Sequence, residues 1–175
     1  MKRLLIAVLA MGFVTAMAQS GAAQGNPRGK TDLNLGRKMV SVEYGRPSLN
    51  GRSVSALLDR LKPGDFWRLG ADTSTTFHSA LNLQFGDVAL PFGKYSIWVQ
   101  RAEGDTWRLV FNKQVGQWGT QHDPAQDFAS VPLKQTKASD SAEMVTITLT
   151  KEGEGGILAI QWGDMKLTAD FKPAA

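Results

Sequence analysis

Basic side chains that could bind a ligand lie in the segments of the chain that lack a periodic apolar pattern. Arg46, Arg52 and Arg68 stand beside turn residues such as glycine and proline. A planar guanidinium group forms paired hydrogen bonds with carboxylates and phosphates, so a converging set of arginines predicts an anion site. Arginines beside such turns also fix loops by bonding backbone carbonyl groups or nearby carboxylates. Both roles are open for each of the three.

An asparagine and a tryptophan extend this candidate set. Asn112 ends a predicted strand, and Trp118 lies between two glycines in a loop of about fifteen residues, which is long for a compact domain. An exposed indole there would stack on a sugar or an aromatic ligand, whereas an indole folded inwards would cover the core. Trp67 is predicted to be a core residue because tryptophan buries a large area. The predicted ligand-binding residues are Arg46, Arg52, Arg68, Asn112 and Trp118.

A polar loop contains the donor types of a metal site. His122, Asp123 and Asp127 would provide one imidazole and two carboxylates. Such a set arises easily by chance, so we predict neither a metal nor another cofactor. For hydrolysis we nominate Asp72 and Asp123 as the carboxylate pair, with His122 beside them. The chain has no cysteine, no Gly-x-Ser-x-Gly turn and no His-Glu-x-x-His helix, and these absences favour a binding module over an enzyme.

The elements that must position these residues alternate apolar and polar side chains, as half-buried strands do. The pattern predicts strands over 40–44, 76–85, 94–100, 106–112, 130–136, 144–150, 157–162 and 165–171. Pro132 restricts its strand to a sheet edge or a bulge. Gly163-Asp164 is typical of a turn, so the last three strands are predicted to form a meander.

One segment has helical spacing instead. Residues 53–61 place four apolar side chains on one face of a helix, with Ser53 as the N-cap. Many short strands with one short helix predict an all-β fold, either an antiparallel β-sandwich or a jelly-roll-like domain. A closed barrel is the alternative, because alternation alone does not distinguish the two architectures.

The N-terminus has the parts of a secretion signal. Lys2 and Arg3 precede an apolar run over 4–14, and Ala16-Met17-Ala18 offers small residues for cleavage. The run is too short to span a bilayer, and no cysteine follows it to accept a lipid. The mature protein is therefore expected in the periplasm or outside the cell, without a stable membrane anchor. We expect a signal peptide over 1–18, a flexible leader over 19–37 and a single β-rich domain over 38–173.

The charge pattern excludes one class of partner. The chain carries 20 Lys and Arg against 16 Asp and Glu, and removal of the signal leaves 18 basic residues and a net charge of +2. These charges are scattered and form no basic stripe, so nucleic-acid binding is not expected. No pattern in the sequence indicates an oligomeric state.

Several short motifs follow one another in the first part of the expected domain. They are Arg46-Pro47-Ser48-Leu49-Asn50-Gly51-Arg52, Trp67-Arg68-Leu69-Gly70-Ala71-Asp72, Gly93-Lys94-Tyr95-Ser96, Phe111-Asn112-Lys113 and Trp118-Gly119. Over roughly residues 40–127 this combination resembles the bacterial family known as domain of unknown function 2911 (DUF2911). The resemblance implies an exported β-rich domain and no particular reaction. Two positions depart from the family pattern, with Asp72 in place of asparagine and His122 in place of tyrosine.

The sequence thus predicts an exported binding module for a small polar or anionic ligand, such as a saccharide or a cell-envelope fragment. The candidate residues lie in loops and at strand ends, where binding residues are often found. One alternative is a hydrolase, with or without a metal, that uses Asp72, His122 and Asp123. Another is a structural envelope protein that binds its partners through a sheet edge.

Overall fold

The alternating pattern produces an all-β fold. The computed structural model describes residues 25–174, and these form ten strands, one short α-helix and two 3-10 turns. The strands are β1 (Arg28–Leu35), β2 (Lys38–Gly45), β3 (Phe66–Trp67), β4 (Thr76–Ser79), β5 (Leu83–Phe85), β6 (Val88–Leu90), β7 (Gly93–Arg101), β8 (Trp107–Asn112), β9 (Asp127–Glu152) and β10 (Gly155–Pro173). The helix is α1 (Val54–Leu58), and the 3-10 turns are η1 (Glu103–Asp105) and η2 (Pro124–Gln126).

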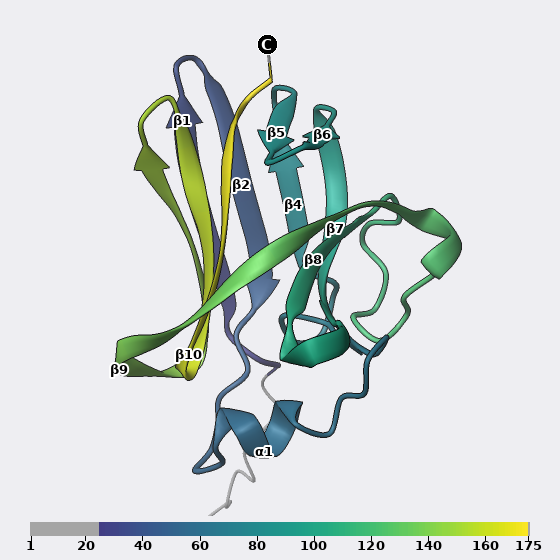
Figure 1. Ribbon diagram of the computed structural model, residues 1–175, viewed down its shortest axis with the longest axis vertical. Coiled ribbons are helices and arrows are strands. Elements are labelled where there is room, and N and C mark those ends of the chain that lie inside the picture. Colours follow the sequence, from purple (N-terminus) through teal and green to yellow (C-terminus); the bar gives the residue numbers. More distant parts are fainter. Residues whose placement is uncertain (1–24, 175) are drawn as a thin grey trace, which may run out of the picture.

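The strands form one antiparallel path that folds back on itself. Its order is β1-β2-β4-β7-β8-β9-β10-β5-β6, and β3 pairs with β7. Figure 1 shows β9 running diagonally across the molecule, from the side of β8 to the side of β10. Residues 127–133 of β9 pair with β8, whereas residues from Lys134 onward pair with β10. The two halves of the path therefore pack as two layers, and the predicted all-β antiparallel fold is confirmed.

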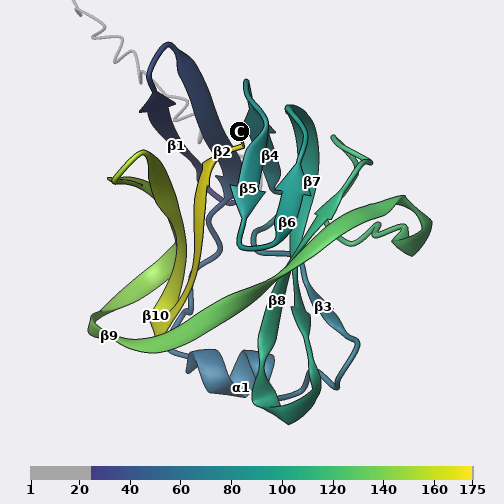
Figure 2. The same cartoon turned by 45° about the horizontal axis from the view of Figure 1, so that its top comes forward.

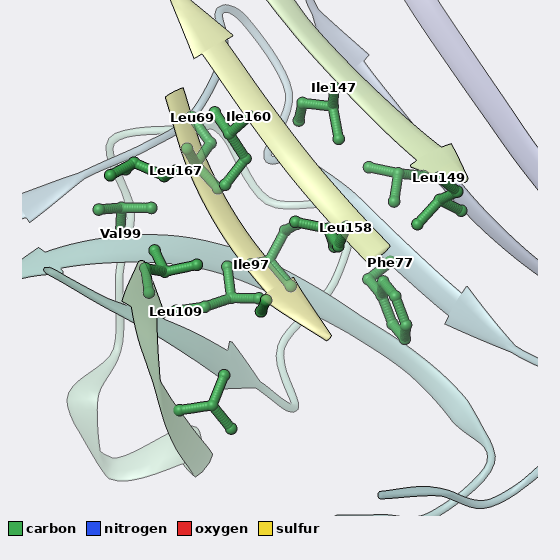
Figure 3. Close-up of a cluster of buried hydrophobic side chains, with 14 of the residues drawn as sticks. Leu69, Phe77, Ile97, Val99, Leu109, Ile147, Leu149, Leu158, Ile160 and Leu167 are labelled. Carbon is green, nitrogen blue, oxygen red and sulfur yellow. The ribbon is translucent and has the colours of Figure 1, made fainter. Parts of the chain in front are cut away.

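The core lies between these layers. Figure 3 shows apolar side chains of β7 and β8 gathered with those of β9 and β10, among them Ile97 and Leu158, which are both fully buried. Phenylalanine rings join the layers as well, because Phe85 of β5 lies 6.3 Å from Phe77 of β4 and 5.2 Å from Phe111 of β8, measured between ring centroids. Such aromatic pairs add about 0.5–1.5 kcal/mol beyond the burial of their area. Packing of this kind holds together a chain that has no cysteine.

The prediction of one strand over 76–85 is wrong, because the segment forms two strands with different neighbours. β4 pairs with β2 and β7, whereas β5 pairs with β10 and β6. Between them, the Ser79 hydroxyl donates to the Leu81 carbonyl at 2.6 Å and lies 3.3 Å from the Leu81 N–H, so the chain bends out of the ladder. Both halves bury their apolar side chains, and the two-residue period therefore continues through the bend and conceals it.

The predicted turn at Gly163-Asp164 is also wrong, because β10 continues through it as a bulge. The register between β9 and β10 shifts on both sides of Gly163, which has a φ of 59°. Glycine adopts this left-handed conformation without steric cost, and a bulge bends a strand without ending it. The last part of the domain is therefore a long bent hairpin instead of a three-stranded meander.

Part of the expected leader belongs to the domain. Residues 28–35 form β1, which pairs with β2 along its whole length, so the leader prediction over 19–37 is wrong for this part. Leu33 and Leu35 bury the inner side of the strand, while charged and polar residues on its outer side obscure the alternation. The expected signal peptide over 1–18 lies outside the described residues. In residues 25–174 no helix is long and apolar enough to cross a membrane.

The predicted helix is present but shorter than residues 53–61. Ser53 caps α1, since its hydroxyl accepts a hydrogen bond from the N–H of Ala56 at 3.1 Å. Asp65 then accepts from the N–H of Lys62 at 2.8 Å and closes the turn that follows. In Figure 2 the helix lies across one end of the strands. This end of the molecule also holds the site described below.

Side chains of β1 and β2 cover the outer edge of β9. The hydroxyl of Tyr44 accepts from the N–H of Ile147 at 2.8 Å and donates to its carbonyl at 3.2 Å. The hydroxyl of Thr31 accepts from the N–H of Leu149 at 3.2 Å. Unpaired backbone groups on a sheet edge invite pairing with another chain, and these side chains satisfy them within the molecule.

Candidate functional site

Two of the short motifs cross each other at a point where only glycine fits. A Cβ atom at Gly45 would lie 2.2 Å from the carbonyl oxygen of Ala71, and one at Gly70 would lie 3.0 Å from the carbonyl oxygen of Gly45. Real Cβ atoms essentially never lie as close as 2.2 Å to another heavy atom, so Gly45 is required for the approach of the backbones, and the tight 3.0 Å contact favours glycine at position 70 as well. The crossing places the loop over 46–52 beside the segment over 67–72.

The long loop between β8 and β9 docks on the same segment. The N–H of Gly119 donates to the carbonyl of Asp72 at 2.7 Å, and the N–H of Ser74 donates to the carbonyl of Gln117 at 2.9 Å. A Cβ atom at Gly119 would lie 2.8 Å from the Asp72 carbonyl oxygen and 3.3 Å from Cδ of Arg68. Asp72 itself has a φ of 63°, which asparagine and aspartate tolerate better than other side chains. The aspartate at this position is therefore compatible with the backbone conformation of the segment.

These segments and α1 enclose a cleft with a volume of about 540 Å³. This is within the range of small-molecule sites in proteins. The helix α1 and the turn after it contribute three apolar side chains to the lining, those of Leu57, Leu58 and Leu61. Five aromatic or imidazole rings form much of the lining: Phe66, Trp67, Trp98, His122 and Trp162. Two arginines, Arg52 and Arg68, also line the cleft, and no carboxylate does so in the described part of the chain.

The rings of the cleft pack against one another in two groups. Trp67 and Trp162 are stacked, with their centroids 5.6 Å apart and an interplanar angle of 10°. The imidazole of His122 lies 4.1 Å from the ring of Phe66 and 4.8 Å from that of Trp98, again between centroids. These five rings, which we call the aromatic wall, therefore hold one another in place in the absence of a ligand.

The three residues that have the donor types of a metal site have separate roles. Nε2 of His122 lies 2.8 Å from Oδ1 of Asp127, and that oxygen also accepts from the Asn112 amide at 2.8 Å. The carboxylate of Asp123 instead accepts from the N–H of Ala125 at 3.0 Å and caps η2. No group of three metal-ligating side chains forms within residues 25–174. The contact with Asp127 orients the imidazole in the wall of the cleft.

Arg68 is a half-buried cation of the cleft whose guanidinium group lacks a partner among residues 25–174. Its backbone carbonyl accepts a hydrogen bond from the Thr75 hydroxyl, but its guanidinium group makes no hydrogen bond or ion pair with any described residue. The guanidinium group has five N–H donors and no acceptor. These donors are therefore available to an anionic molecule in the cleft.

The other two predicted arginines bind backbone. Arg46 donates from Nε to the carbonyl of Val145 at 3.2 Å and from Nη2 to the hydroxyl of Thr146 at 3.1 Å, so it joins its loop to β9. Arg52 donates to two carbonyl groups of its own loop, at 2.8 and 3.2 Å. Arg52 still lines the cleft, whereas Arg46 lies outside it.

Asn112 and Trp118 do not line the cleft. Asn112 is fully buried, and its amide donates to the carbonyl of Asp123 at 2.8 Å, which fixes the long loop. Trp118 is 53% exposed, although Gly119 and Thr120 directly after it line the cleft. Of the five predicted ligand-binding residues, the structure brings only Arg52 and Arg68 together in this cavity.

The residues nominated for hydrolysis are not gathered either. The carboxylate of Asp72 accepts from the backbone N–H of Asn26 at 3.1 Å, next to the start of the described chain. Neither Asp72 nor Asp123 lines the cleft, whereas His122 does.

The loop over 46–52 is also tied to β9 by a carboxylate. Glu143 accepts from the hydroxyl of Ser48 at 2.8 Å and from the N–H of Asn50 at 2.9 Å. The hydrogen bond from Ser48, followed by that from Asn50, lowers the pKa of Glu143. At another place in the molecule, burial raises the pKa of Tyr95. The Glu143 contacts hold the loop that carries Arg52 into the cleft.

Sequence reasoning missed the aromatic wall. Phe66, Trp98 and Trp162 lie in strands, where an apolar pattern predicts core residues and does not distinguish the lining of a cavity. The available signal was the tryptophan content, since three of the five tryptophans in the chain line this one cleft. The structure adds a second signal, because Nε1 of Trp162 is buried without a hydrogen-bond partner among the described residues.

Comparison with known proteins finds one family. The family model described as "Protein of unknown function (DUF2911)" matches residues 26–171, which include all the motifs and extend to the C-terminal hairpin. No curated protein and no solved structure matches the chain.

Proposed function

The chain belongs to the DUF2911 family, whose description states no function, and we propose that it is a binding module for a small anionic molecule held in the cleft beside α1. The free guanidinium group of Arg68 carries this proposal. Hydrogen bonds from a charged donor to an anion are among the strongest that proteins form, and no described residue occupies the donors of this half-buried group. A saccharide acid, an envelope fragment or another small acid would supply the missing acceptor.

The surroundings of Arg68 support an anion over a cation. Arg52 provides a second positive charge, and the lining contains no carboxylate from residues 25–174 that would neutralise either one. Apolar rings beside the guanidinium group reduce the local dielectric constant, which strengthens its attraction for a negative charge. A cationic ligand would meet repulsion in the same place.

A thermal-shift experiment with Arg68→Gln tests the proposal. The wild-type protein is screened against benzoate, phosphate, glucuronate and muramic acid, and at least one acid is expected to raise Tm by binding the folded state. Loss of the charged hydrogen bonds in Arg68→Gln should weaken that acid by about 10- to 100-fold. The variant should keep its own Tm, because the guanidinium group supports no other described residue.

The matched control is Arg37→Gln. Arg37 lies in the turn between β1 and β2, at the opposite end of the molecule from α1 (Figure 1). Its substitution should leave the shift unchanged. Equal shifts in wild type and Arg68→Gln, or no shift with any of the acids, would contradict the proposal.

We also propose that the protein is exported and acts in the periplasm or outside the cell. The support is the N-terminal sequence, in which a basic start, an apolar run and Ala16-Met17-Ala18 occur in the order of a cleavable signal. Expression of the full chain in a bacterial host, followed by fractionation and intact mass measurement, should yield a non-cytoplasmic protein that begins near Gln19. The variant Ala18→Arg should accumulate uncleaved. A wild-type product that stays in the cytoplasm with residues 1–18 attached would refute export.

A further inference from the structure

The hydrogen-bonding groups of the cleft narrow the class of ligand. Hydroxyl groups of a neutral sugar donate as well as accept, so their burial requires acceptor side chains nearby. No Asp, Glu, Asn or Gln from the described residues lines the cleft. Arginine and tryptophan side chains only donate, and the side-chain acceptors of the described lining are limited to Thr120 and His122, whose Nε2 already contacts Asp127. The cleft therefore fits a ligand whose polar atoms are acceptors and whose remaining surface is apolar.

The aromatic wall indicates the shape of that apolar part. Its rings already lie at stacking distances from one another, with centroid separations between 4.1 and 5.6 Å. A flat ring continues such an arrangement by offset or edge contacts, which a flexible alkyl chain cannot form. An aromatic ligand also loses little conformational freedom when it binds, unlike an alkyl chain.

A buried donor gives an independent reason to expect an acceptor. The side chain of Trp162 is 6% exposed, and its Nε1 has no hydrogen-bond partner in the described part of the chain. Buried N–H groups in folded proteins nearly always have one. Trp162 lines the cleft but its Nε1 is buried beneath the surface, so a ligand acceptor would complete its hydrogen bonding only after a small shift of the neighbouring side chains.

We infer that the ligand is an aromatic carboxylic acid, with its carboxylate on Arg68 and its ring against the aromatic wall. The inference rests on the proposed function, since it specifies the molecule that the same cleft binds. It commits to a flat acid instead of a saccharide or a fatty acid. The two oxygens of a carboxylate match the paired donors of the guanidinium group.

Isothermal titration calorimetry with four probes separates these classes. The probes are 2-naphthoate, 2-naphthamide with the same ring but no charge, decanoate with the same charge but no ring, and glucuronate as a sugar acid. We expect 2-naphthoate to bind the mature chain at least tenfold more tightly than each of the other three. Arg68→Gln should weaken 2-naphthoate at least tenfold, and the control Arg37→Gln should not change its Kd.

Two further variants test the contacts of the ring and the donor. Phe66→Leu keeps an apolar side chain and removes an aromatic face, so it should weaken 2-naphthoate several-fold and leave decanoate unchanged. Trp162→Phe keeps a ring and removes the unpartnered N–H, so it should also weaken 2-naphthoate. Circular dichroism and Tm establish that each variant is folded. Wild-type affinity for 2-naphthoate in Phe66→Leu would refute the placement of the ring, and wild-type affinity in Trp162→Phe would refute the contact with Nε1.

The outcomes distinguish the inference from the proposed function. Binding of decanoate or glucuronate that depends on Arg68, without comparable binding of 2-naphthoate, would overturn the aromatic acid and leave the anion site standing. An absence of binding by all three acids, or binding that Arg68→Gln does not weaken, would overturn both.

Discussion

At the scale of single residues, a few side chains complete hydrogen bonding where strand pairing stops. The Tyr44 hydroxyl serves both backbone groups of Ile147 at the outer edge of β9. Its removal leaves a buried N–H and a buried carbonyl without partners, and such a loss costs about 1–3 kcal/mol. We therefore expect Tyr44→Phe to lower the free energy of unfolding by about that amount in urea titrations.

Tyr95 offers a matched control for this variant. It is also buried, but its hydroxyl donates a single hydrogen bond, to the carbonyl of Pro91 at 3.1 Å. Tyr95→Phe should cost about 0.5–1.5 kcal/mol, the net value of one ordinary hydrogen bond. A Tyr44→Phe variant that is no less stable than Tyr95→Phe would show that the edge of β9 does not depend on this hydroxyl.

The partners of the arginines could not be predicted from the sequence. Arg46 and Arg68 both stand in motifs beside turn residues, yet the Arg46 guanidinium group binds the carbonyl of Val145, whereas that of Arg68 binds no described residue. The difference depends on β9, whose Val145 lies 99 residues after Arg46 in the sequence. The local spacing of residues does not indicate contacts between segments so far apart. The sequence identifies arginine as the residue type suited to an anion, but the fold determines which arginine has a guanidinium group that binds no other described residue.

At the scale of elements, the contact between two motif segments shapes the cleft. Gly45 ends β2, and a Cβ atom there would lie 2.2 Å from the Ala71 carbonyl. Gly45→Ala must therefore push the segments apart. We expect a loss of about 1–3 kcal/mol or more in the free energy of unfolding, as for other overpacked sites.

Gly25→Ala is the control for this substitution. Its Cβ atom would meet only a side-chain oxygen of Asp72, at the ordinary contact distance of 3.5 Å. Its stability in urea titrations should match that of the wild-type protein within about 0.5 kcal/mol. If Gly45→Ala were equally stable, the close crossing of the two motifs would be excluded.

Most elements could be predicted because a strand that buries one face leaves a two-residue period in its sequence. The same period fails to show where a strand changes neighbours. At Ser79 to Asn82 the chain leaves one layer for the other, and at Gly163 a bulge bends β10, but the apolar side chains alternate on both sides of each irregularity. β1 was missed for the opposite reason, because its polar outer face outweighs two buried leucines.

At the scale of the whole molecule, Glu143 joins the loop over 46–52 to β9, and this link responds to acid. Its pKa is lowered in the folded protein by the Ser48 and Asn50 hydrogen bonds. A carboxylate with a lowered pKa stabilises the fold above its ordinary value of 4.5, and that contribution is lost as the pH falls towards the lower folded value. The free energy of unfolding should therefore decrease as the pH is lowered below about 4.5.

Glu143→Gln provides the comparison, because glutamine keeps an acceptor oxygen but does not titrate. Urea titrations over a series of pH values should show a smaller decrease below pH 4.5 for the variant than for the wild-type protein. Identical pH dependence in the two proteins would mean that the carboxylate charge does not hold the loop.

The place of β10 in the topology determines when the protein can fold. This strand pairs with most of β9, and its residues 172 and 173 pair with β5, so a growing polypeptide that has not reached them lacks the pairing of β5 with β10 and the contact of Phe85 with Phe171. The strand path therefore cannot close before β10 has been made. Under the export that we propose, a precursor whose fold closes this late would reach a secretion pore while still unfolded.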